Sequence, residues 1–128
     1  MRQHSRGFTL IELLVVVAII GILSAVGVVS FSGYKDSAEK KQAEITLNSI
    51  YLAEQEYKSN NGEYYFNSST SNLVTNLFDG VDDLSEQSFT FKTTNANTLT
   101  ITATKKTNTS CTISITQINK KPNVSNSC

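Results

Sequence analysis

The apolar positions of this chain form one long run near the N-terminus, and further along they recur at helical spacing. No charged residue occurs between Leu13 and Tyr34. This stretch of 22 residues is long enough to cross a bilayer as a helix, which takes about 20 residues. The run therefore predicts an N-terminal helix that lies in lipid or against other apolar helices.

Beyond this run the helical spacing continues and marks two apolar faces. The first face carries Ala38, Ile45 and Leu52, and the second carries Ala43, Leu47, Ile50 and Tyr57. Asn60-Asn61-Gly62 is a typical helix end, so we expect one helix from Phe8 to about Ser59, roughly 80 Å long. One face should pack against the protein's own head. The other face either meets a partner or widens the same core stripe.

Charged residues along this second half are spaced for ion pairs on the helix surface. Asp36 and Lys40 lie four residues apart with the acid first, and so do Glu54 and Lys58. Such a pair stabilises a helix by about 0.2–0.5 kcal/mol. We therefore expect both pairs to be small surface contributions.

In the C-terminal third the apolar spacing changes to two. Three alternating segments lie at Phe89–Phe91, Leu99–Ala103 and Cys111–Ile115, with turns at 95–97 and 105–110. This pattern predicts three antiparallel strands with one apolar face. Before them, a short helix is expected around Leu73, Val74 and Leu77, ending at Asp79-Gly80, and the tail from Lys120 is expected to be irregular. The predicted fold class is α+β, a long N-terminal helix packed on a small antiparallel sheet.

One carboxylate, Glu12, lies just inside the start of the apolar run. An acidic residue costs about 2.5–3.5 kcal/mol at the centre of a membrane helix and less near the interface, so it usually has a partner. No basic residue follows within two turns, and Arg6 lies on the far side of Gly7. Pairing within the chain is therefore not expected.

The segment Gly7-Phe8-Thr9-Leu10-Ile11-Glu12 and the apolar residues up to Leu23 resemble the N-terminus of a type IV prepilin. The short basic leader, the glycine before phenylalanine and the glutamate four residues after that phenylalanine all match. The resemblance implies the pilin fold, closed by a C-terminal disulfide loop. It departs from the family at Val29, where many members have proline, and this puts a kink of the helix there in doubt.

The resemblance implies that a prepilin peptidase cuts between Gly7 and Phe8 and methylates the new N-terminus at Phe8. Residues 1–7 would be the leader, 8–34 the transmembrane and assembly helix, and 35–128 the rest of the helix with the globular head. The subunit would sit in the bacterial inner membrane, and assembly machinery there would add it to an extracellular helical homopolymer. Glu12 would then pair with the N-terminal ammonium of a neighbouring subunit.

Two other interpretations of the N-terminus start from the same residues. A secretory signal peptide fits Arg2, Arg6 and the apolar run, with a loose cleavage site at Ala25-Val26-Gly27. That interpretation leaves Glu12 unexplained. A plain membrane anchor with Arg2 and Arg6 inside also fits, and it agrees with the pilin interpretation before assembly.

Two cysteines, Cys111 and Cys128, are candidates for a disulfide that staples a small head. Both lie in the part expected outside the cytoplasm, where disulfides persist. Charge is unevenly spread, because residues 35–86 carry ten acidic residues against four lysines and residues 87–128 carry five lysines and no acid. With zero net charge overall, no general attraction to nucleic acid is expected.

Catalytic and cofactor chemistry is not expected. The one histidine, His4, lies in the leader, and no phosphate-binding loop, CxxC or EF-hand spacing occurs. Asp79, Asp82, Asp83 and Glu86 form a cluster that is either a solvated loop or a weak calcium site; we expect no metal.

The predicted function is therefore structural, as a pilus subunit for adhesion, motility or DNA uptake. One alternative is a minor pilin that binds DNA or anionic surfaces through Lys105, Lys106, Lys120 and Lys121. The other is a type II secretion pseudopilin; major pseudopilins typically bind calcium in the C-terminal region, where this chain has no carboxylate side chain.

Overall fold

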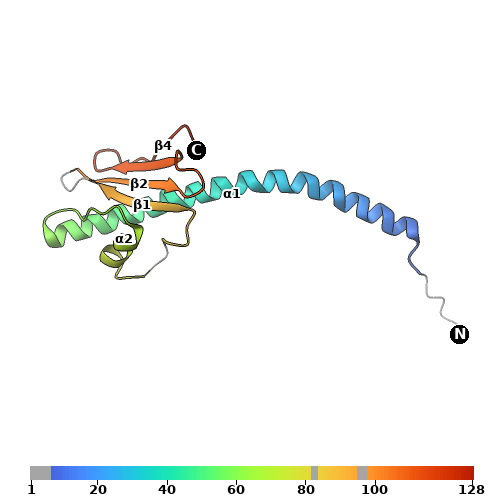
Figure 1. The fold of residues 1–128 in the computed structure, drawn as a ribbon, viewed down its shortest axis with the longest axis horizontal. Coiled ribbons are helices and arrows are strands. Elements are labelled where there is room, and N and C mark those ends of the chain that lie inside the picture. The colour runs from blue at the N-terminus through green and yellow to red at the C-terminus, as the bar shows by residue number, and fades with distance from the viewer. Residues whose placement is uncertain (1–6, 82–83, 95–97) are drawn as a thin grey trace. The chain divides into compact units, whose positions relative to one another are not determined.

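The structure, a computed structural model, describes residues 7–81, 84–94 and 98–128 (Figure 1). Its elements are α1 (Leu10–Asn61), α2 (Thr70–Leu77), β1 (Phe89–Thr94), β2 (Thr100–Lys105), β3 (Thr112–Thr116) and β4 (Asn123–Val124). The chain divides into two compact units, with the boundary between Ser37 and Ala38. The helix α1 therefore contributes to both units, and the second unit is the head.

The long helix begins and ends close to the expected positions, with one correction at each end. It starts at Leu10 rather than Phe8, and it continues to Asn61 rather than stopping near Ser59. Gly62 follows with a φ of 87°, a left-handed conformation that ends helices and that glycine adopts at little cost. The only proline in the sequence is Pro122, so nothing of that kind interrupts α1.

The sheet is an antiparallel meander in the order β1-β2-β3-β4. Phe89 pairs with Lys105 across β1 and β2, and Ile101 pairs with Ile115 across β2 and β3. Burial alternates along β1 residue by residue, as the period of two requires. The predicted fold class is confirmed, but the expectation that the whole tail is irregular is wrong, because Asn123–Val124 adds a short fourth strand beside β3.

The core of the head lies between α1 and one face of the sheet (Figure 1). Its fully buried side chains include Ala43, Leu47, Ile50, Leu73, Phe89, Phe91, Ile101, Ala103, Ile113 and Ile115. The other predicted face of α1 stays open, with Ile45 61% and Leu52 67% exposed. The interpretation of both faces as one broad core stripe is therefore wrong.

The segment between α1 and α2 lies along the outer edge of β1. The Thr93 N–H donates to the Asn67 carbonyl at 2.9 Å, and the Asn67 N–H donates to Thr93 Oγ1 at 2.8 Å. Further along, the Phe91 N–H donates to Thr70 Oγ1 at 2.9 Å. The outer strand thus has partners for its backbone on both sides.

The short helix α2 forms where Leu73, Val74 and Leu77 predict it, and it buries the first two of these residues. The Gly80 N–H donates to the Val74 carbonyl at 3.1 Å, and Gly80 has a φ of 80°. The predicted stop at Asp79-Gly80 is therefore confirmed. The turn expected at 95–97 lies outside the described residues.

Candidate assembly segment

The start of α1 is organised by Thr9 and Glu12. The Thr9 N–H and the Thr9 hydroxyl both donate to Glu12 Oε2 at 2.8 Å. In return, the Glu12 N–H donates to Thr9 Oγ1 at 3.3 Å. This reciprocal arrangement is a capping box, in which a threonine and a glutamate three residues later satisfy backbone donors at a helix N-terminus.

The capping box corrects the expectation that Glu12 has no partner within the chain. Its partners are the Thr9 hydroxyl and the Thr9 backbone N–H, both neutral groups, and not a basic side chain. The sequence contains the pattern that predicts this arrangement, because Thr9-Leu10-Ile11-Glu12 has the spacing of a capping box. Glu12 also lines a shallow surface hollow together with Phe8, Ile11 and Val15.

The two residues expected to flank the leader cleavage site, Gly7 and Phe8, precede the helix. Phe8 is 83% exposed, and nothing lies within 4 Å of a Cβ placed on Gly7. Their backbone is thus accessible in a single subunit. A side chain at position 7 would meet no obstacle within the chain, so any need for glycine there has to come from another molecule.

The first half of α1 shows apolar side chains on every side. None of the side chains described between Leu10 and Tyr34 is buried. The helix is long and apolar enough to cross a membrane by length and composition. In the head, by contrast, side chains of the same types are fully buried. The first half of α1 therefore needs cover that its own unit does not supply.

The disulfide expected between Cys111 and Cys128 is present, with a Cα–Cα distance of 4.5 Å. It joins the start of β3 to the tail that follows β4. The Lys40 ammonium donates to the Cys128 carbonyl oxygen, and Ser125 Oγ donates to the Ser110 carbonyl at 3.1 Å. The staple thus holds the tail against the sheet and beside α1.

The four lysines of the predicted anion contact do not form one patch. Lys105 pairs with Glu39 at 3.3 Å, and Lys106 donates to the Ser85 carbonyl at 2.7 Å. Lys120 lies over the ring of Tyr51, 5.5 Å from its centroid. The β2–β3 register puts the first pair at one end of β2 and the loop with Lys120 and Lys121 at the other end. The geometry therefore gives no single surface for a phosphate backbone.

The acidic cluster gives no metal site within the described residues. Asp79 and Glu86 are exposed, and Asp82 and Asp83 lie outside the part of the chain that is described. No group of three metal-ligating side chains was found among residues 7–81, 84–94 and 98–128.

The burial of the Glu54 carboxyl was not predicted from the sequence. It is fully buried, and its Oε2 accepts a hydrogen bond from the Tyr65 N–H at 2.8 Å. Among the described residues, its Oε1 has no hydrogen-bond partner. Burial raises the pKa of Glu54 to about 7, although the hydrogen bond from Tyr65 opposes the shift.

The expected Glu54–Lys58 pair is therefore wrong, because Lys58 lies over the ring of Tyr64 instead, 4.2 Å from its centroid. The signal for burial was the position of Glu54 in the series Leu47, Ile50, Glu54 and Tyr57, whose steps of three and four define the core face.

Comparisons with known proteins match one family model and several curated proteins. Residues 2–28 match the family described as prokaryotic N-terminal methylation motif. The type IV major pilin protein PilA of Myxococcus xanthus is 40% identical over 61 residues, which is 48% of this chain and 28% of that protein. A fimbrial protein of Neisseria meningitidis serogroup B is 36% identical over 75 residues, 59% of this chain and 44% of that protein.

A second class of relative appears in the same comparison. The type II secretion system core protein G of Klebsiella michiganensis is 38% identical over 63 residues, 49% of this chain and 44% of that protein. The chain thus spans less than half the length of these relatives. It carries the prokaryotic N-terminal methylation motif, and over about half its length it is similar both to type IV pilins and to a type II secretion core protein.

Proposed function

We propose that this protein is a structural subunit of a type IV pilus, which polymerises through α1 into an extracellular filament. The observation that carries this proposal is the methylation motif at residues 2–28 at the start of a helix whose first half has no cover in its own chain. Lipid supplies such cover before assembly, and the helices of other copies supply it afterwards. No described feature of the head favours catalysis.

In this proposal a prepilin peptidase cuts after Gly7 and methylates the amino group of Phe8. The accessible, non-helical backbone at these two residues supports the cut. The mature subunit stays in the inner membrane, with the head outside the cytoplasm, until the assembly machinery extracts it. Adhesion, motility and DNA uptake are then properties of the fibre.

Glu12 is proposed to change partner during assembly. In the single subunit, Thr9 satisfies its Oε2. In the fibre, the methylated ammonium of a neighbour approaches the same carboxylate in surroundings that exclude water, where the attraction is much stronger than at a wet surface. Because desolvating both charges offsets most of that gain, the pair acts mainly to set the register between subunits.

The processing step is tested with Gly7→Glu. We expect full-length protein in the membrane fraction and no surface fibres, whereas Ser5→Glu, with the same added charge two residues earlier, should be processed. Mass spectrometry of sheared fibres from the parent chain should give an N-terminus at Phe8 that carries one added methyl group. An unmodified N-terminus elsewhere contradicts the proposal.

The role of Glu12 is tested by comparing Glu12→Val with Thr9→Ala in strains that lack the parent chain. Both remove the capping box, but only Glu12→Val removes the carboxylate that would pair between subunits. We expect processing in both strains, and fibres only with Thr9→Ala. Normal fibres with Glu12→Val alone would show that the carboxylate has no role in assembly.

The similarity to the secretion core protein favours a second candidate, a pseudopilin of a type II secretion system. Gel electrophoresis of fibres sheared from the cell surface distinguishes the two candidates. If the protein is a pilus subunit, it should give the main band of this fraction. If the parent chain is processed and is absent from surface fibres, while its deletion blocks protein secretion, the second candidate replaces the first.

A further inference from the structure

A groove on the head presents apolar side chains between α1 and the segment that follows α2. It has a volume of about 270 Å³, and its apolar lining residues are Ile45, Phe78, Val81 and Leu84. The polar residues Gln42, Thr46, Ser49 and Gln87 complete the lining. Ile45 is 61% and Val81 69% exposed. All these residues belong to the head, which is one compact unit. The head therefore buries its core and still leaves apolar surface open in a concave site.

An exposed apolar side chain, Ile118, lies on the loop between β3 and β4. Ile118 is 88% exposed, the highest value among the large apolar side chains described. One exposed isoleucine is ordinary on a protein surface. Here it stands beside Lys120 and Lys121, and the loop is held in place because the Gln117 N–H donates to the Leu99 carbonyl at 2.8 Å.

The groove and Ile118 lie at opposite ends of the sheet. The loop follows Thr116, which pairs with Thr100 at the start of β2. The groove segment leads into Phe89, which pairs with Lys105 at the end of β2. Five residues of strand separate these ends by about 17 Å.

This placement matters for assembly, because two different surfaces that fit each other on distant parts of a subunit produce an open, repeating polymer. A self-complementary patch would instead close a dimer.

The charges of the two segments are complementary. Among the described residues of the segment 79–86, Asp79 and Glu86 are acidic and none is basic, whereas residues 117–122 contain two lysines and no acid. On this side of the head, Lys105 is paired with Glu39 and Lys41 with Glu44 at 2.7 Å. Lys106 donates to the Ser85 carbonyl and keeps its positive charge. Opposite charges should favour the orientation in which the loop 117–122 of one copy faces the groove segment of another. Like charges should disfavour orientations that bring two acidic or two basic segments together.

We propose that Ile118 of one copy of this chain inserts into the groove of a second copy, with Lys121 opposite Glu86. The contact joins heads, and it is separate from the packing of the first half of α1. This inference rests on the proposed function, since it concerns neighbouring subunits in the same fibre. The occupant proposed for the groove is a second copy of this chain, and not DNA or a small molecule.

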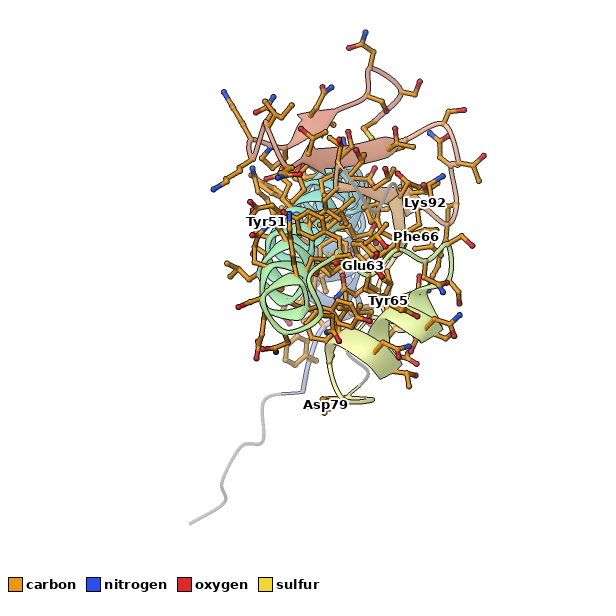
Figure 2. All side chains as sticks on the ribbon, turned by 90° about the vertical axis from the view of Figure 1, so that its left-hand side faces the viewer. Tyr51, Glu63, Tyr65, Phe66, Asp79 and Lys92 are labelled. Carbon is orange, nitrogen blue, oxygen red and sulfur yellow. A yellow bond between two sulfur atoms is a disulfide. The ribbon has the colours of Figure 1, made fainter. Side chains whose placement is uncertain are left out.

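The experiment uses full-length chains assembled into fibres on cells. Ile118→Cys is combined with Val81→Cys, and the native disulfide is kept and checked by intact mass. Mild oxidation of sheared fibres should then link successive subunits into a ladder on a non-reducing gel. The matched control combines Ile118→Cys with Phe66→Cys, because Phe66 is exposed at 59%. Phe66 lies on the α1–α2 segment (Figure 2), which contributes no residue to the groove.

A ladder with Val81→Cys and none with Phe66→Cys supports the contact. Fibres that form normally and give no ladder with Val81→Cys overturn it, and the proposed function stands. A cross-link from Val81→Cys to a different protein also overturns it, because another occupant would then fill the groove. If the parent chain itself gives no fibres, the proposed function fails and takes this inference with it.

A charge exchange tests the same contact without added cysteines. Lys121→Glu and Glu86→Lys should each lower fibre yield several-fold, because each brings like charges together. The double exchange should restore the yield. If the single changes leave fibre yield as it is, or the double exchange is no better than either, the proposed orientation is wrong.

Discussion

The two halves of α1 have similar backbones and opposite relations to the rest of the chain. In the second half, Ala43, Leu47 and Ile50 are fully buried under the sheet. In the first half, side chains of the same kinds are open all round, with Leu10 81% and Phe31 71% exposed. The first half holds one acidic residue, Glu12, near its start.

The difference teaches that this helix is stabilised from two sources. The head supplies cover for the second half, as an ordinary folded protein does. The first half needs cover that its own unit does not supply, and in the proposed function this cover is lipid or other copies. Stability of the head and competence for assembly should therefore be separable by mutation.

The largest effect is expected from cutting α1 between its halves. A fragment of residues 38–128, made in an oxidising compartment, should be soluble without detergent and should unfold cooperatively, because it retains the whole core. The full chain should require detergent or assembly into fibres. Sedimentation and thermal unfolding followed by near-ultraviolet circular dichroism measure both. A fragment that aggregates or lacks a cooperative transition would show that the halves depend on each other.

The next effect concerns the staple of the head. Cys128→Ser should lower the free energy of unfolding by about 2–5 kcal/mol, the usual cost of losing a native disulfide in a small secreted domain. Urea unfolding of the head measures it, with Ser127→Ala as the neighbouring control. Cys111→Ser and the double variant should cost about the same as Cys128→Ser, because all three remove one bond. Additive losses would mean that the cysteines act separately.

A further effect comes from the buried carboxyl of Glu54. Its pKa rises from about 4.5 to about 7 in the folded head, so the folded state keeps its proton at pH values where the unfolded chain has lost it. The free energy of unfolding should therefore be highest below pH 4.5 as far as this group is concerned. It should fall by about 3 kcal/mol as the pH rises to about 7.

Replacing Glu54 by glutamine should remove that slope. Urea unfolding between pH 4.5 and 7 measures it, with Glu56→Gln, an exposed neighbour on the same helix, as the control that keeps the slope. An unchanged pH dependence in Glu54→Gln would assign the slope to another group. The same variant should leave processing at Gly7 as it is, since the two lie in different units.

The smallest effect is expected at the start of α1. Thr9→Ala should destabilise the first turn by about 1 kcal/mol, because the helix loses its N-cap. Amide hydrogen exchange of residues 10–13 in detergent micelles should become faster, and exchange in the head should not change. Thr9→Ser keeps the hydroxyl and should behave like the parent chain. Equal exchange in all three proteins would mean that the capping box adds no stability.

Periodicity alone predicted most of the fold. The step of seven and the steps of three and four predicted the second half of α1 with two apolar faces, but not which of the two faces is buried. The alternation from Phe89 onward predicted three strands. These signals work because one face of each element must be apolar. The pair Asn123–Val124 was not predicted, since two residues after Pro122 carry no readable period and are paired only because β3 lies beside them.

The candidate site was predicted in part, for reasons that differ by residue. Gly7, Phe8 and Glu12 were readable from a contiguous motif, and their proposed roles stay predictions. Thr9 was readable as a cap and was overlooked. Glu54 was misassigned because a charge four residues before Lys58 is typical of a surface pair, while its actual partner, the Tyr65 N–H, is supplied by a loop. The separation of the four lysines depends on strand register, which composition does not contain.

The covered edge of β1 has a consequence for how this protein avoids aggregation. A bare outer strand is a template on which other chains can add strands of their own. Here Asn67 and Thr70 occupy the backbone groups of that edge, and the opposite edge ends in a strand of only two residues. A protein proposed to concentrate in a membrane and then polymerise through its helix thus leaves its sheet little capacity for amyloid-like growth.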